Sequence, residues 1–101
     1  MKYSTYYVVS TGPQRVFLAN NGKLYPFTTL SHGNGPKSIK KFKSLGWSKR
    51  AAQKASWGNV WGGDIVVIGL LPDECLMMDG LVFFRDQEGG WQDCGYGRQV
   101  V

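Results

Sequence analysis

The stretch from Lys37 to Trp57, KSIKKFKSLGWSKRAAQKASW, decides the fold. Its first part, Ile39 to Lys43, alternates apolar and basic side chains, which is typical of an edge strand because lysines there discourage pairing with other chains. Ser44 comes next, and its hydroxyl can accept the free amide hydrogens of a first helical turn. The pattern therefore predicts a short strand that runs into one helix from about Ser44 to Ser56.

The predicted helix is amphipathic. Trp47, Ala51 and Ala55 follow each other at i, i+4 and i+8, with Leu45 and Ala52 beside them, which forms one apolar stripe. The small alanines would let the helix approach a sheet closely. We therefore expect this stripe, including Trp47, to face the core.

The rest of the chain predicts strands joined mainly by hairpins. We expect strands at residues 2–10, 15–19, 23–27, 64–71, 81–85 and 91–94, while residues 75–78 fit a short helix or extended chain. Asn20-Asn21-Gly22 is the clearest tight turn, because Asn and Gly tolerate positive φ. Residues 1–101 are thus expected to form a single α+β domain. It would be a small antiparallel β-sheet with one main α-helix packed on one face, in two layers, its other face partly exposed.

The net charge of +5 conceals an uneven distribution. Residues 1–63 carry ten basic residues and no acid, whereas residues 64–101 carry two basic residues and seven acids. Folding of the halves against each other would neutralise part of this charge, but an excess of five positive charges remains. Such asymmetry suggests an anionic partner, either nucleic acid or an acidic protein.

Basic side chains interleaved with aromatic ones suggest contact with nucleic acid, because lysines bind phosphates and aromatic rings stack on bases. The alternative is a solvated helix face. The candidate residues for binding nucleic acid or another partner are the basic residues of the opening stretch and its last tryptophan: Lys37, Lys40, Lys41, Lys43, Lys49, Arg50, Lys54 and Trp57.

No catalytic or metal-binding pattern is present in the sequence. A cysteine nucleophile needs a base held close, and the single histidine, His32, lies in a glycine-rich loop. A tetrahedral metal site needs about four ligands. Cys75 and Cys94 are therefore interpreted as small buried thiols, or as a disulfide if the protein is exported. We expect a protein that is not an enzyme and that uses no cofactor and no metal.

The first residues, MKYSTYYVVS, lack the apolar core of a signal peptide, and no run approaches the ~18 apolar residues of a membrane span. With only two cysteines, the chain does not have the composition of a disulfide scaffold. We expect a cytoplasmic monomer or homodimer that makes no membrane contact.

The block from Phe42 to Ala52, FKSLGWSKRAA, preceded by a YVV…FL…GKL hairpin, resembles small accessory proteins of phages and mobile elements. The later order of helix, apolar strand and terminal hairpin, closing on Trp91 to Cys94, is similar to some small anti-CRISPR inhibitors. The resemblance covers about residues 42–94, and the chain departs from it in the Leu30–Pro36 loop and the 72–80 connection. It transfers no individual binding residue.

This resemblance implies a stoichiometric inhibitor of host defence that covers a nucleic-acid-binding surface or touches the nucleic acid itself. Its partner would be a nucleoprotein such as a CRISPR surveillance complex, in the host cytoplasm if the chain is phage-encoded. The alternative is a protein-only adaptor or inhibitor that uses the acidic C-terminal hairpin and exposed aromatics, without nucleic-acid contact.

Overall fold

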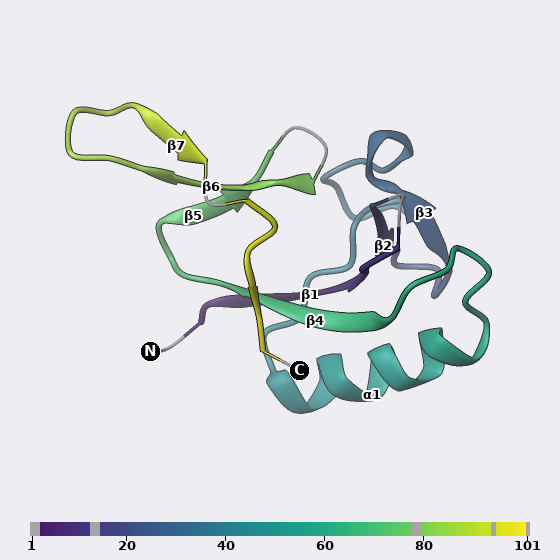
Figure 1. The fold of residues 1–101 in the computed structure, drawn as a ribbon. Helices are drawn as coiled ribbons and strands as arrows, with labels where there is room; N and C mark the ends of the chain where they lie inside the picture. The colour runs from purple at the N-terminus through teal and green to yellow at the C-terminus, as the bar shows by residue number, and fades with distance from the viewer. Residues whose placement is uncertain (1–2, 13–14, 78–79, 94, 101) are drawn as a thin grey trace.

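The centre of the fold is an antiparallel pair of strands, β1 (Thr5–Ser10) and β4 (Ile65–Leu70). They pair in register from Thr5 opposite Leu70 to Ser10 opposite Ile65. Figure 1 shows this pair crossing the middle of the molecule. The structure is a computed structural model that describes residues 3–12, 15–77, 80–93 and 95–100.

Two antiparallel sheets and one α-helix make up the described structure. The larger sheet has the strand order β3-β2-β1-β4-β8, and the smaller one has the order β5-β6-β7. The other strands are β2 (Val16–Leu18), β3 (Leu24–Pro26), β5 (Glu74–Leu76), β6 (Val82–Arg85), β7 (Trp91–Asp93) and β8 (Arg98–Gln99). A 3-10 helix, η1 (Phe27–Thr29), follows β3.

The helix α1 (Leu45–Trp57) begins and ends close to where its sequence predicts. The Ser44 hydroxyl accepts a hydrogen bond from the Trp47 amide at 3.4 Å, as expected of an N-cap. Gly58 follows the last turn, and its amide donates to the Ala55 carbonyl. None of the described helices has the length and apolar character that a bilayer span requires.

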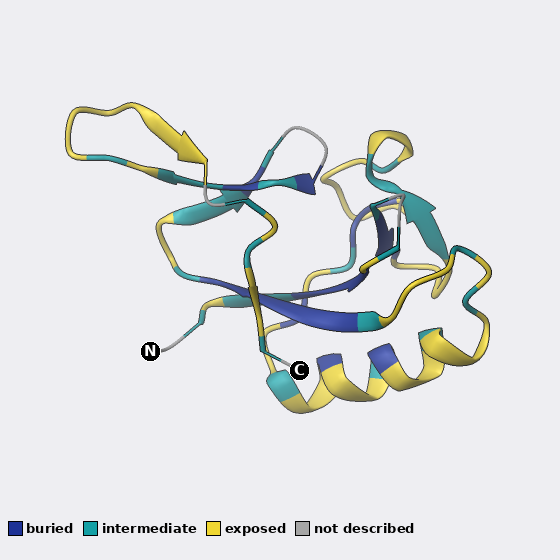
Figure 2. Cartoon of the chain, viewed as in Figure 1, coloured by how far each residue is buried: buried dark blue, intermediate teal, exposed yellow. Residues whose placement is uncertain are grey.

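Both faces of the β1–β4 pair are buried (Figure 2), because successive side chains of a strand point to opposite faces. On one face, Val8 and Val67 pack against Ala52 of α1 and against Phe42. The other face carries a separate cluster, which is formed by Tyr7, Val9, Phe17, Ile39, Val66, Ile68, Leu70, Leu76 and Val82. The molecule therefore has one core on each side of the larger sheet.

The predicted α+β class, with one helix on one face of an antiparallel sheet, is confirmed. The expectation that the opposite face would be partly exposed is wrong, since Leu76 of β5 and Val82 of β6 cover it. The physical reason lies in β4, where apolar residues occupy both alternating sets of positions, so both faces must be removed from water. Of residues 75–78, which fit either a short helix or extended chain, Cys75 and Leu76 belong to β5, and Met78 lies outside the described residues.

The edge strand predicted over Ile39–Lys43 is wrong. This segment forms only isolated bridges, from Ile39 to Ala19 and from Phe42 to Tyr6. β2 pairs with β1 at Val9 and leaves the beginning of β1 uncovered on that side. Among the described residues, Phe42 fills this position by an isolated bridge to Tyr6, so no continuous strand forms there.

The core position predicted for Trp47 is also wrong, since 64% of its surface is exposed. The helix instead turns Leu45, Ser48 and Ala52 towards the sheet, a spacing of i, i+3 and i+7. Ser48 is fully buried, and its hydroxyl donates to the Leu45 carbonyl at 2.7 Å, which offsets the cost of burying a polar group. A small residue with a satisfied hydroxyl lets the helix lie close, and the bulky indole points outward.

The turn after β1 and the loop before β4 approach each other so closely that only glycine fits. Gly63 has φ +71°, and a Cβ there would meet the backbone nitrogen of Gly12 and lie 2.6 Å from its Cα. Gly22, in the β2–β3 turn, also has positive φ (+84°), but a Cβ there would meet nothing within 4 Å.

Gly63→Ala should therefore lower the free energy of unfolding by about 3 kcal/mol, from backbone strain and close contact together. Gly22→Ala, the matched control, should cost only the backbone term, about 1 kcal/mol. Urea denaturation of both variants measures the difference. Equal losses would contradict the close approach of the two backbones.

Candidate nucleic-acid interface

Three shallow hollows follow each other along one side of α1, and together they are named the α1 groove. The first is lined by Lys40, Lys41, Lys43 and Trp47, among others. The second shares Lys40 with the first and adds Lys54. The third shares Lys54 and continues to Lys23 and Trp61. Their volumes are about 320, 310 and 310 Å³.

The walls of the groove come from segments that are distant in sequence. One wall is α1, where Ala51 and Ala55 are small enough to leave space beside the helix. The other wall is the β2–β3 turn together with the segment that leads to α1. Hydrogen bonds hold this segment against β2: the Lys40 amide donates to the Leu18 carbonyl at 2.9 Å, and the Asn20 amide donates to the Ser38 carbonyl at 3.0 Å.

The groove is strongly cationic. In the part of the chain that the structure describes, no carboxylate lines its three hollows, whereas five lysines do: Lys23, Lys40, Lys41, Lys43 and Lys54. Within the described parts of the chain, none of these lysines forms an ion pair; the pair found there joins Arg98 to Glu74 at 2.8 Å. Like charges gathered without counter-ions repel each other, and an anionic ligand would relieve that repulsion.

The structure brings together part of the predicted binding set. Lys40, Lys41, Lys43 and Lys54 line the groove. The other four predicted residues lie outside the three hollows: Lys37, Lys49, Arg50 and Trp57.

These four predicted residues outside the groove are all exposed. The Lys37 ammonium lies 5.3 Å from the centroid of the Tyr25 ring, and the Arg50 guanidinium lies 5.2 Å from that of Trp47. Lys49 lies on α1, and Trp57 ends the helix with 75% of its surface exposed. These residues add positive charge and one indole to the surface around the groove.

Three groove residues were missed by sequence reasoning: Lys23, Trp47 and Trp61. Trp47 had a detectable signal, because Trp47, Arg50 and Lys54 also follow helical spacing, at i, i+3 and i+7, and form a polar-aromatic stripe. Lys23 had none, and Trp61 had only its position beside loop glycines, which Trp57 shares. Lys23 and Trp61 reach the groove only because β3 and the loop after α1 fold to the same side of the helix.

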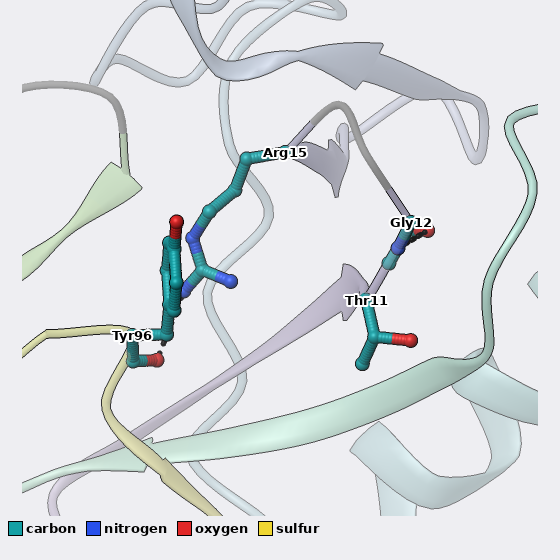
Figure 3. Close-up of a pocket in the computed structure, with 5 residues that line it drawn as sticks. Thr11, Gly12, Arg15 and Tyr96 are labelled. Atoms are coloured by element: carbon teal, nitrogen blue, oxygen red, sulfur yellow. Dashed lines mark hydrogen bonds between the residues drawn. The ribbon is translucent and has the colours of Figure 1, made fainter.

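A separate pocket of about 320 Å³ is lined by Ser10, Thr11, Gly12, Arg15 and Tyr96 (Figure 3). The Arg15 guanidinium donates to the Gly80 carbonyl at 3.1 Å and to the Tyr96 carbonyl at 2.9 Å. It also lies 4.5 Å from the centroid of the Tyr96 ring. Burial lowers the pKa of Arg15, and Tyr96 opposes that shift. Arg15 thus joins its own segment to those of Gly80 and Tyr96. Its place in this pocket is therefore explained by a structural role.

The hairpin formed by β6 and β7 is a second exposed surface, of acidic character, on the side of the larger sheet away from α1 (Figures 1 and 2). The Asp86 carboxylate accepts hydrogen bonds from the Gln92 side chain at 2.8 Å and from the Gly90 amide at 2.7 Å, and these lower the pKa of Asp86. Trp91 is 46% exposed, with the Arg85 guanidinium 5.6 Å from its ring centroid.

Cys75 and His32 line none of the three hollows of the groove. Cys75 is a free, half-buried thiol in β5, and Cys94 lies outside the described residues. Burial, and then the neighbouring Cys75, raise the pKa of Tyr7. The His32 ring packs 5.8 Å from that of Phe27. Across the described residues, no group of three or more His, Cys, Asp or Glu side chains is placed to hold a metal ion.

No protein-family model matches this chain, and neither a curated protein nor a solved structure matches it, so the assignment of a function depends on the geometry of the groove.

Proposed function

We propose that this protein is a non-enzymatic binding protein that docks the α1 groove on nucleic acid, either alone or within a nucleoprotein complex. One observation carries the proposal: five lysines line the three adjoining hollows of the α1 groove, and among the described residues no carboxylate lines them. Phosphates would replace the missing counter-ions. The resemblance to phage accessory proteins and anti-CRISPR inhibitors favours a nucleoprotein of host defence, such as a CRISPR surveillance complex, as the target.

Binding of this kind depends strongly on salt, because each neutralised phosphate releases condensed counter-ions. The slope of log affinity against log salt is about −0.9 per phosphate on duplex DNA and about −0.7 on a single strand. If all five groove lysines contact phosphates, the slope is roughly −3.5 to −4.5. The other basic residues on α1 contribute to long-range attraction of the ligand rather than to contact.

Reversal of two groove charges tests this proposal against reversal of two charges outside the groove. The variant Lys41→Glu/Lys54→Glu should bind oligonucleotides at least about tenfold more weakly at low salt, with a shallower salt slope. The control Lys37→Glu/Lys49→Glu changes the net charge equally and should weaken binding less than about threefold. Fluorescence anisotropy measures both, and circular dichroism checks that each variant is folded.

Equal losses in the two variants would mean that net charge alone attracts the ligand. If the unmodified protein binds neither single-stranded nor duplex oligonucleotides at low salt, and captures no nucleoprotein, the proposal is wrong.

The acidic hairpin favours a second candidate function, an adaptor that binds a protein. Every described residue of β7 is exposed, and as the outer strand of its sheet β7 has an unpaired backbone edge. Exposed tryptophan is also enriched at protein interfaces.

Under this alternative, a protein partner captured from host extract should remain bound after nuclease treatment and should be lost in Trp91→Ala. The groove variant Lys41→Glu/Lys54→Glu should still capture it. Release of every partner by nuclease would exclude the adaptor.

A further inference from the structure

Two tryptophans stand at opposite ends of the α1 groove. Trp47 lines the first hollow, beside the start of α1, and Trp61 lines the third, beyond the end of the helix. Between them lie lysines from both walls and the small side chains of Ala51 and Ala55. The groove thus has a cationic middle with an aromatic ring at each end.

Both rings belong to organised local structure. The Trp47 amide donates to the Ser44 cap, and Arg50 lies one helical turn further on, with its guanidinium 5.2 Å from the Trp47 ring centroid. The Trp61 amide donates to the Asn59 side chain at 3.0 Å, and the Asn59 amide group donates to the Gly63 carbonyl at 3.1 Å. These hydrogen bonds hold the backbone from which each ring projects, and a held backbone reduces the entropy lost when a ligand packs on the ring.

Aromatic rings of this kind suit unpaired bases. In a duplex the base faces are stacked on each other, whereas a single strand can place them on aromatic side chains. From Trp47 to Lys54 the helix rises roughly 10 Å. At about 3.4 Å per stacked nucleotide, this part of the groove accommodates about three nucleotides. The third hollow, with Trp61, continues beyond Lys54.

We infer that the ligand of the α1 groove is a single-stranded nucleic acid, its bases stacked on Trp47 and Trp61 and its phosphates held by Lys40, Lys41 and Lys54. This inference rests on the proposed function and adds the form of the nucleic acid. The contacts are to base faces and phosphates, which DNA and RNA share.

The experiment compares three labelled probes of about ten nucleotides: a single-stranded DNA, a single-stranded RNA of the same sequence, and the corresponding DNA duplex. The protein should bind one or both single strands at least about tenfold more tightly than the duplex. Trp47→Ala should weaken single-strand binding by roughly tenfold. Preference for DNA or for RNA would identify the source of the strand.

Trp57→Ala is the matched control, because Trp57 is another exposed indole on α1 and lines none of the hollows. It should change the affinity less than about twofold. Trp61 is half-buried, so Trp61→Phe, which retains a ring, accompanies Trp61→Ala. The phenylalanine variant should bind more tightly than the alanine variant at equal foldedness.

If the duplex binds as tightly as the single strands, or if Trp47→Ala behaves like Trp57→Ala, the single-strand inference is wrong. The proposed function would survive that result as long as Lys41→Glu/Lys54→Glu still weakens binding. Absence of binding to all three probes would overturn the single-strand inference, and it would overturn the proposed function as well if the protein also captures no nucleoprotein.

Discussion

The antiparallel pairing of β1 with β4 is the constraint on which the rest of the structure depends. Because its six-residue register buries valines on both faces, the pair needs cover on each side. The helix supplies one cover, and the smaller sheet supplies the other. This arrangement separates the cationic helix from the acidic hairpin, so the two halves of the chain do not neutralise each other at the groove.

The groove follows from how closely α1 can approach that pair. Ala52 and the buried Ser48 allow the helix to pack near the sheet, and the segment before Ser44 is bonded to β2. Lysines on the helix, on this segment and in the β2–β3 turn are thereby brought to one side. Their mutual repulsion opposes folding, whereas the two cores favour it, and a bound anion would remove the repulsion.

About half of the candidate site could be predicted from the chain alone. Lys40, Lys41 and Lys43 are close in sequence, so a local basic run indicated them, and Lys54 follows on the same helix. Hydrophobicity assigned the indole of Trp47 to the core, although Trp47 also shares a polar-aromatic stripe with Arg50 and Lys54. What decided its position was the close approach of the helix, which small residues such as Ala52 and Ser48, with its hydroxyl satisfied, permit.

The amino-acid sequence by itself determined the helix and its Ser44 cap, the turn at Gly22, the apolar strand β4 and the uneven distribution of charge. Each of these depends on spacing or hydrogen bonding between near neighbours in the chain. Only the tertiary structure decided that a second sheet covers the back of the first, that residues 39–43 form bridges rather than a strand, and that Lys23 and Trp61 join the groove. Those outcomes depend on contacts between residues far apart in sequence, and local patterns do not specify which distant segments meet.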